Sequence, residues 1–541
     1  MEKRAFLAVA LSLLVLVLYQ AWVTHQYGTA PLPPPPAERR EVAKTDSERP
    51  RTSAPVTPEI KPAEIPAEEK VNVKDVRVET DKYVAVFTNQ GGRLKSFQFK
   101  RYRSSVDEKS PPFDIISTLP GVPLPLGVQW QTPKPVDDSG LVYAIQRGDL
   151  NLTGDAKGTL RFEGRTENGS RITKTFSFTG SNYGIGLAVS AQTAEGKSLT
   201  PEIELTEKSD HSALNPDAKF EGLIALVDSK IKREMADKAG AGHEFTGDIS
   251  WAGFGYTYFL FALIPDNSAQ NRLSLRHSGN SLIAVLGGAA GESGESSRYT
   301  LYIGPKDLDT LKAAGKGLER SIDFGYFAFI AIPLVYALHF FHRFTGSYGI
   351  DIILLTIVIK ILLAPLTHKS MVSMKKMQRL QPQMERLKER FKDDKEKLNK
   401  EIMELYRRNS VNPLGGCLPM LLQFPVFIGL YNALGTPIEL RHAPFLWIKD
   451  LSRPDWQSLP FTFAGWHLGI PVLTILMGAS MFVQQWMTPT AGDPNQRKMM
   501  LLMPLMFTFM FVTFPAGLTI YWLVNNLLSI GQQYWINRKE S

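Results

Sequence analysis

The sequence predicts a multi-domain membrane protein. We expect an all-α transmembrane core of six spans, five of them in one bundle, and an all-β sandwich domain outside the membrane. Long apolar runs dominate residues 321–541, and a bilayer crossing requires runs of about 20 residues. Short alternating apolar runs fill residues 71–310. A further apolar stretch stands at the N-terminus, and the 541 residues are enough for two or three domains.

Residues 1–23 are expected to form a signal anchor. The basic start MEKR (1–4) precedes an uncharged, mostly apolar stretch over residues 5–23. This stretch exceeds the roughly 7–15 residues of a typical signal-peptide core, and no cysteine for lipid attachment follows it. We expect an uncleaved span with the N-terminus inside, and a cleaved signal peptide is the alternative.

Residues 24–70 are expected to form an extended tether. Ten prolines fall within residues 31–70, including the run 33–36, and no periodic apolar pattern accompanies them. Such a composition favours an extended or disordered linker. It would let a folded domain hang from the first span.

Residues 71–310 show the strand-and-turn pattern of a β-sandwich. The clearest strands are YVAVFTN (83–89), ITKTFSFTG (172–180) and SRYTLYIG (297–304). Trp130 and Trp251 are expected to anchor the core rather than a ligand site. The chain contains no GxSxG, HExxH or P-loop motif, so nothing in it predicts an enzyme or a cofactor. The single cysteine, Cys417, predicts neither an intramolecular disulfide nor a metal site.

The C-terminal part contains five apolar segments that could contact a membrane. The last of them, 499–537, is too long for one span, and Pro515-Ala516-Gly517 is expected to divide it into two helices. The other candidates are 324–342, 350–368, 414–434 and 468–487.

Charge decides which of these segments cross. Residues 369–408 hold thirteen Lys and Arg against seven Asp and Glu, so most of the chain's net charge of +8 lies in this segment. Basic loops stay in the cytoplasm. The basic segment is cytoplasmic only if the segment 324–342 lies along the outer membrane surface instead of crossing the membrane. This segment belongs to an expected interfacial region, 311–345. The core then spans 346–541, and both termini are cytoplasmic.

The basic segment 369–410 predicts a cytoplasmic helical hairpin. Two sets of apolar residues recur at three- and four-residue spacing, and Asp393-Asp394 between them is a turn and helix-start signal. Two interpretations stay open, a topology determinant or a docking arm. Because membrane topology explains the charge as well as a binding role does, no nucleic-acid binding is predicted. The apolar residues are Met377, Leu380, Met384, Leu387 and Phe391, then Leu398, Ile402 and Leu405.

Lys360 is the most informative single residue. It lies near the middle of 350–368, where an ionisable group costs about 2.5–3.5 kcal/mol on insertion scales. No Asp or Glu stands at mid-depth in any predicted span, so hydration is expected, with snorkelling as the alternative. Further polar or amphipathic residues that could line the same cavity are Thr356, Gln423, Tyr521, Trp522, Asn525 and Asn526.

Four motifs give a family resemblance: VIKILLAPLT (358–367), NPLGGCLPMLLQFPVF (412–427), DPNQRKMM (493–500) and FPAGLTIYWLVNNLLSIGQQ (514–533). In this order they resemble the YidC/Oxa/Alb family of membrane protein insertases. The anchor, tether and β-domain match the layout of its Gram-negative members.

The resemblance implies a five-helix core with a hydrophilic groove that is open to the cytoplasm and lipid and closed outside. Lys360 corresponds to a groove residue that is usually Arg, and Lys keeps the charge without the bidentate fork. The implied groove residues are Lys360, Thr356, Gln423, Tyr521, Trp522 and Asn525. The implied hydrophobic slide for substrates comprises Phe424, Phe427 and Met510.

The resemblance also implies the function and partners. We expect an insertase and chaperone for nascent membrane proteins in the bacterial inner membrane, with a periplasmic β-domain. It would act alone or with the Sec translocon and its accessory subunits, contact the ribosome and a targeting receptor through cytoplasmic loops, and bind membrane lipids. The alternative is a secondary transporter of small anionic solutes, which would normally show repeated halves and membrane carboxylates. A scaffold that acts through its β-domain is a third hypothesis.

Overall fold

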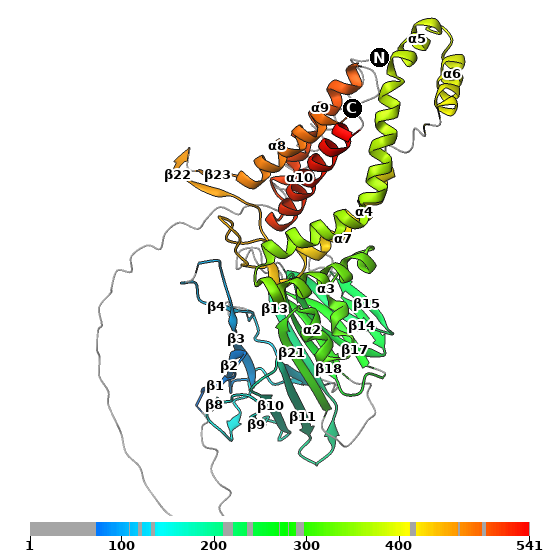
Figure 1. Cartoon of the computed structure of the whole chain (residues 1–541). Coiled ribbons are helices and arrows are strands. Elements are labelled where there is room, and N and C mark those ends of the chain that lie inside the picture. The colour runs from blue at the N-terminus through cyan, green and yellow to red at the C-terminus, as the bar shows by residue number, and fades with distance from the viewer. Residues whose placement is uncertain are drawn as a thin grey trace, which may run out of the picture. The chain divides into compact units, whose positions relative to one another are not determined.

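The computed structural model in Figure 1 describes most of residues 72–539. The predicted anchor (1–23) and tether (24–70) lie outside the described residues. The gaps within the described part are 108, 117–121, 131–135, 209–219, 235–241, 270, 280, 288–296, 410, 412–417, 464–465 and 489–493.

The first part of the chain folds into three β-sheets, which confirms a strand-rich domain. A five-stranded sheet has the order β4-β3-β2-β1-β8 and comprises β1 (Asp75–Glu79), β2 (Tyr83–Thr88), β3 (Arg93–Arg103), β4 (Pro112–Asp114) and β8 (Leu150–Asn151). A six-stranded sheet has the order β16-β19-β20-β13-β5-β6 and comprises β5 (Gly127–Trp130), β6 (Val136–Asp137), β13 (Pro201–Lys208), β16 (His243–Gly247), β19 (Asn271–Ser278) and β20 (Ser281–Gly287).

The largest sheet runs β15-β14-β17-β18-β21-β11-β10-β9-β7, with β12 beside β11. Its strands are β7 (Ala144–Ile145), β9 (Lys157–Arg165), β10 (Arg171–Thr179), β11 (Gly184–Gln192), β12 (Ser198–Leu199), β14 (Phe220–Val227), β15 (Lys230–Glu234), β17 (Ile249–Tyr256), β18 (Phe259–Pro265) and β21 (Ser297–Pro305).

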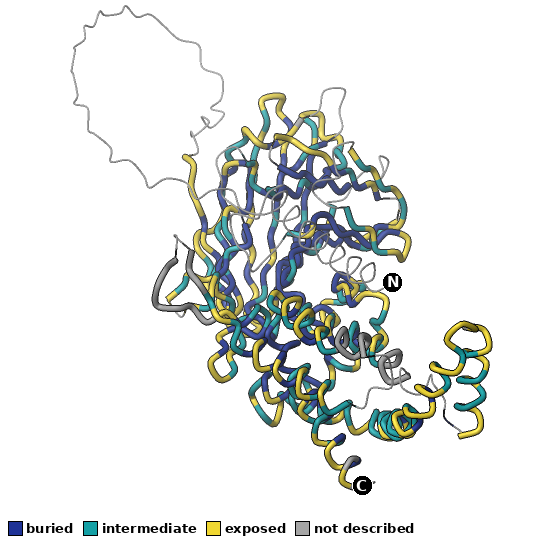
Figure 2. The backbone as a smooth tube through the Cα atoms, turned by 90° about the horizontal axis from the view of Figure 1, so that it is seen from above, coloured by how far each residue is buried: buried dark blue, intermediate teal, exposed yellow. Residues whose placement is uncertain are grey.

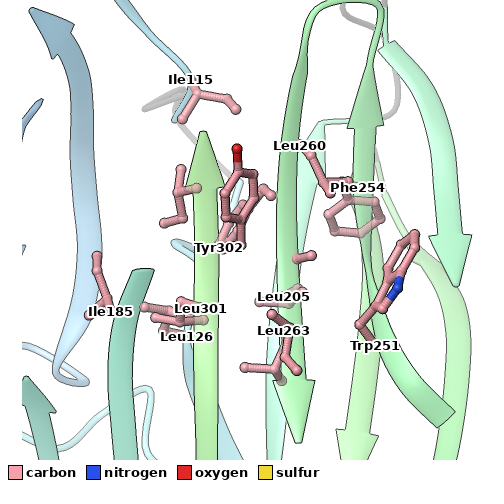
Figure 3. Packing of buried hydrophobic residues seen from close by; sticks show 14 of the residues in the cluster. Ile115, Leu126, Ile185, Leu205, Trp251, Phe254, Leu260, Leu263, Leu301 and Tyr302 are labelled. Atoms are coloured by element: carbon pink, nitrogen blue, oxygen red, sulfur yellow. The ribbon is translucent and has the colours of Figure 1, made fainter. Parts of the chain in front are cut away.

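The β-domain owes its core to the alternation that the sequence shows. Along β10, buried residues alternate with more exposed ones, so one face of the strand turns inward. Trp130 and Trp251 are 2% and 0% exposed and belong to one hydrophobic cluster, as expected. Figure 3 shows Trp251 and Phe254 on β17, Leu263 on the neighbouring β18, and Leu301 on β21, which follows β18 in the sheet. Figure 2 shows buried residues gathered in the interior, with exposed residues mainly on the turns and at the periphery.

A buried group of charges joins the three sheets. The Asp138 carboxylate accepts from Lys174 Nζ at 2.5 Å, from the Tyr143 hydroxyl at 2.9 Å and from Arg93 Nη2 at 3.5 Å. Arg93 Nη1 also lies 3.4 Å from Glu204 Oε2. Burial lowers the pKa of Lys174, and the Asp138 charge opposes that shift. Because each charge has partners, the group holds the sheets together and leaves no open site.

The rest of the chain is mainly helical, which confirms the predicted helical C-terminal core. Its elements are α2 (Leu308–Ala314), η2 (Leu318–Ser321), α3 (Ala328–Thr345), α4 (Tyr348–Arg379), α5 (Gln381–Arg390), α6 (Lys395–Arg408), α7 (Leu418–Gly435), η4 (Ile438–Leu440), β22 (Gln457–Phe463), β23 (Trp466–Ile470), α8 (Val472–Met487), α9 (Pro494–Phe511) and α10 (Ala516–Lys539). Among the described helices, α3 and α4 meet the length and hydropathy of a membrane span, and Val472–Met487 and Leu501–Phe511 are shorter apolar helices. The count of six spans stays a prediction.

Several boundaries differ from the sequence expectations. The segment 350–368 continues as one helix to Arg379, so the first residues of the predicted hairpin extend α4. The segment 468–487 starts as a helix only at Val472, because β23 and Pro471 precede it. The division of 499–537 falls where expected, since α9 ends at Phe511 and α10 begins at Ala516. The β22–β23 hairpin was not expected.

Candidate functional site

Lys360 lies where α4 packs against α10. Its Nζ donates a hydrogen bond to Ser529 Oγ at 2.5 Å, and Ser529 Oγ donates to the Asn525 carbonyl at 2.7 Å. The Lys360 side chain is half-buried, and among the described residues no carboxylate forms an ion pair with it. The hydrogen-bond partner of the Lys360 ammonium group is therefore a neutral hydroxyl, and no carboxylate of the described residues neutralises its charge.

Ser529 is a residue that the sequence reasoning missed. It lies one turn after Asn525 on α10, so the two residues share a helix face. Gln532 continues this polar face, and its Nε2 donates to Thr367 Oγ1 on α4 at 3.2 Å. The spacing 525, 529 and 532 was the available signal. These contacts form a polar seam between α4 and α10, defined by Lys360, Thr367, Asn525, Ser529 and Gln532.

Thr356 lies one turn before Lys360 on α4, so the two residues share a helix face. Its side chain is only 1% exposed, and its Oγ1 donates to the Ile352 carbonyl one turn earlier at 2.6 Å. In this structure Thr356 belongs to the packing of α4.

Gln423, Tyr521 and Trp522 do lie together. The Tyr521 hydroxyl is hydrogen-bonded to the side chain of Gln423 on α7. Tyr521 is buried, while Trp522 is partly buried within an aromatic cluster. Its ring centroid lies 5.0 Å from that of Phe511 and 5.1 Å from that of Phe427. These residues link the ends of α7, α9 and α10.

Asn525 and Asn526 have different surroundings. Asn525 is partly exposed on the polar seam, whereas Asn526 is 3% exposed and its Nδ2 donates to Ser480 Oγ on α8 at 3.0 Å. Asn526 is thus an interhelical hydrogen-bond donor. Asn525 is the asparagine that remains available to a ligand in the seam.

The three expected slide residues are not equivalent. Phe424 on α7 is 61% exposed and Met510 on α9 is 40% exposed. Phe427 packs edge-on against Trp522 and is only partly exposed. Phe424 and Met510 can meet an apolar ligand directly, and Phe427 supports the surface from behind.

The arrangement offers two surfaces, one polar and one apolar. The described residues contain no group of three or more His, Cys, Asp or Glu that could hold a metal ion. They do combine Lys360 in a polar seam between α4 and α10 with exposed apolar side chains on two other core helices, Phe424 on α7 and Met510 on α9. Such a site can accept a segment that is polar at one end and apolar along the rest.

Comparisons with known proteins identify both parts of the chain. The family model described as 60Kd inner membrane protein matches residues 340–541, and the model described as YidC periplasmic domain matches residues 75–337. A membrane protein insertase YidC from Syntrophus aciditrophicus (strain SB) is 40% identical over the full length of both chains. Another, from Geobacter sp. (strain M21), is 41% identical over 86% of each chain.

Among solved structures, the chain resembles an active YidC insertase with its first transmembrane domain resolved. The identity is 18%, the TM-score is 0.38, and the match covers 87% of this chain and 95% of the other. The two family models together cover most of the sequence, and both relatives exceed 30% identity over at least 86% of their length. The chain therefore belongs to the YidC family of membrane protein insertases.

Proposed function

We propose that this insertase receives the polar flank of a nascent membrane segment in the seam around Lys360. The observation that carries the proposal is the Lys360–Ser529 contact without a carboxylate partner among the described residues. A lysine at mid-span costs about 2.5–3.5 kcal/mol on insertion scales, which makes it a candidate for a functional role. An acidic flank of the substrate would supply the missing counter-charge.

The polar seam shortens the hydrocarbon path for that flank. Lys360, Ser529 and the Thr367–Gln532 pair follow one another along α4 and α10 towards the α5–α6 hairpin. The apolar part of the substrate meets Phe424 and Met510, which are exposed on the neighbouring helices. The substrate's polar end is thus solvated by the protein while its apolar part moves into lipid.

We propose six spans with both termini in the cytoplasm. The contacts that support this connect core helix ends to the periplasmic β-domain. Arg441, after the end of α7, bonds to the Arg103 carbonyl in β3, and the same loop caps the start of α10. The His342 ring lies 2.8 Å from Asp351 at the start of α4. Helices α4, α8 and α10 then run inward and α7 and α9 outward.

Helix α3 would lie along the outer surface. Near its start, the Phe324 carbonyl accepts from Asn432 at the outer end of α7, and near its end His342 meets Asp351. Both ends are therefore near outer helix ends, so α3 need not cross. One face of α3 exposes Phe329, Tyr336, Phe340 and Phe344, which suits contact with lipid headgroups and acyl chains.

The proposed domains are a signal anchor (1–23), a tether (24–70), a periplasmic β-domain (71–310), an interfacial region (311–345) and the insertase core (346–541). The hairpin 369–410 would face the cytoplasm and meet a ribosome or targeting receptor. The Sec translocon and membrane lipids would contact the membrane helices, and the protein would act as a chaperone when it works beside the translocon.

The test uses two substrates that differ only in an acidic or a neutral flank. Lys360→Arg should retain insertion of both, as measured by protease protection in inverted vesicles. Lys360→Glu should impair the acidic substrate by about tenfold and spare the neutral one, because like charges repel at mid-span. Equal insertion of both substrates by Lys360→Glu would contradict the charge mechanism. Crosslinking from position 424 to a stalled nascent chain would test the apolar surface.

A further inference from the structure

The loop between α7 and β22 closes over the outer ends of three core helices. We call residues 436–456 the coupling loop. Its residues Leu440, Ile448 and Leu451 are at most 4% exposed. They belong to the same hydrophobic cluster as Leu355 of α4 and Tyr521 of α10. These three residues therefore form an apolar plug next to the helices that carry the polar seam.

The same loop caps two helix N-termini. The Arg453 carbonyl accepts from Ala516 N at 2.7 Å and the Leu451 carbonyl accepts from Gly517 N at 2.9 Å. Asp455 Oδ2 accepts from Leu473 N at the start of α8 at 2.7 Å. Amides in the first turn of a helix have no partner within the helix, so these contacts fix where α8 and α10 begin.

Asp450 holds the coupling loop in this shape. Its Oδ1 accepts from His442 N at 3.1 Å and from Ser452 N at 2.9 Å, and Ser452 Oγ donates to it at 2.7 Å. His442 adopts a left-handed backbone conformation with a φ of 59°. This conformation is unfavourable for residues other than glycine, so the surrounding contacts must stabilise it. These hydrogen bonds thus hold the coupling loop in one defined conformation.

Arg441 connects the coupling loop to the β-domain. Its side chain is almost fully buried, and its Nη2 donates to the Arg103 carbonyl at 2.7 Å. The guanidinium carbon lies 5.7 Å from the ring centroid of Phe113 and 5.9 Å from that of Phe259. These two rings are stacked at 4.6 Å and come from β4 and β18, which belong to different sheets. Arg suits this site because a planar guanidinium can stack and donate together.

We propose that Arg441 is a positioning residue that keeps the outer end of the insertion groove closed. Arg441 anchors the coupling loop on the Phe113–Phe259 pair. This anchor holds the apolar plug in place and keeps the loop bonded to the first turns of α8 and α10. The proposal deepens the proposed function, since it describes how the groove around Lys360 is sealed from the periplasm. In this proposal the β-domain stabilises the closed position of the coupling loop.

The test measures access to the groove from the periplasmic side. In a Cys417→Ser background, Asn525→Cys places one thiol in the seam, about three turns inside the start of α10. A membrane-impermeant maleimide, added to spheroplasts, labels this thiol only when the apolar plug moves aside. Arg441→Ala should raise the labelling rate by about fivefold or more, because a hydrogen bond and a cation–π contact are lost. Arg441→Lys should give an intermediate rate.

Lys449→Ala is the matched control. Lys449 lies in the same loop and carries the same charge, but its side chain is exposed, so its removal should leave the rate unchanged. Phe113→Leu removes the ring that Arg441 covers and keeps an apolar side chain. It should raise labelling as Arg441→Ala does, and the two changes together should add little.

Two results would overturn the proposal. One is an unchanged labelling rate in Arg441→Ala or in Phe113→Leu when circular dichroism shows a folded protein. The other is an equal rise in Lys449→Ala. If Arg441→Ala does not fold, Phe113→Leu decides alone. The readout does not depend on insertion, so it stays valid even if Lys360→Glu has no effect on acidic substrates.

Discussion

At the scale of single residues, the surroundings of Lys360 differ from those of a structural ion pair. A serine hydroxyl, already engaged with the Asn525 carbonyl, is its hydrogen-bond acceptor. An oxygen of this kind solvates an ammonium group and leaves its charge intact. Under the proposed function, this charge would attract an acidic flank that enters the seam.

Placing a carboxylate at position 529 should cancel that effect. Ser529→Asp would put an anion within hydrogen-bond distance of Lys360, and the resulting pair should reduce insertion of substrates with acidic flanks about tenfold. Ser529→Asn keeps a neutral oxygen and should insert them normally. The measurement is protease protection of matched substrates with acidic and neutral flanks. Equal insertion of the acidic substrate by the Asp and Asn variants would exclude a role for the free charge.

A second residue-scale prediction concerns stability. Asp138→Asn would leave Lys174 and Arg93 buried beside a neutral side chain. Breaking a buried ion pair from one side costs about 3–5 kcal/mol, so the β-domain should unfold at a clearly lower urea concentration. Tryptophan fluorescence reports the transition through buried Trp130 and Trp251. Asp137→Asn, at the exposed neighbouring position, is the control and should unfold like the parent protein.

The sequence made Lys360 visible and left Ser529 hidden for physical reasons. A charge inside an apolar run stands out because its transfer into hydrocarbon is costly. A serine in a membrane helix attracts no such notice, because it usually bonds to its own backbone. Its contact with Lys360 also joins residues 169 positions apart. The hydroxyl of Thr356 likewise donates to a backbone carbonyl of its own helix, that of Ile352.

At the scale of elements, the α5–α6 hairpin follows the signals in its sequence. Helix α6 begins after Asp394, whose carboxylate accepts from Lys397 N at 3.0 Å. Asp394→Ala should destabilise the first turn of α6 by about 1 kcal/mol, because an N-cap is lost. Hydrogen exchange of the α6 amides measures this, and they should exchange roughly fivefold faster. The adjacent Asp393→Ala should not change exchange, and an equal effect of both would mean that charge rather than capping matters.

Elements with a local signal were predictable, and elements defined by tertiary contacts were not. Alternation identified β2, β10 and β21, and Pro515 with Gly517 marked the break between α9 and α10. The β22–β23 hairpin escaped because an apolar run of about five residues does not distinguish a strand from a helix end. The coupling loop escaped as well, because its shape depends on Asp450 and on the β-domain.

At the scale of the whole molecule, the β-domain and the helical core share one hydrophobic cluster. Ala331 and Val335 of α3, Ala433 of α7 and Ile438 of the coupling loop belong to the cluster of the β-domain. These residues come from α3, from the C-terminal end of α7 and from the start of the coupling loop. The β-domain is therefore continuous in packing with this part of the helical core.

This continuity leads to a topology prediction. Since the coupling loop contacts the periplasmic β-domain, the hairpin at the other end of α4 should be cytoplasmic. In a Cys417→Ser background, Lys392→Cys in the hairpin should react with an impermeant maleimide only in inverted vesicles. Lys449→Cys in the coupling loop should react only in spheroplasts. Both side chains are exposed, so access does not limit either reaction. Labelling of Lys392→Cys in spheroplasts would mean that α3 crosses the membrane, and the count of six spans would then be wrong.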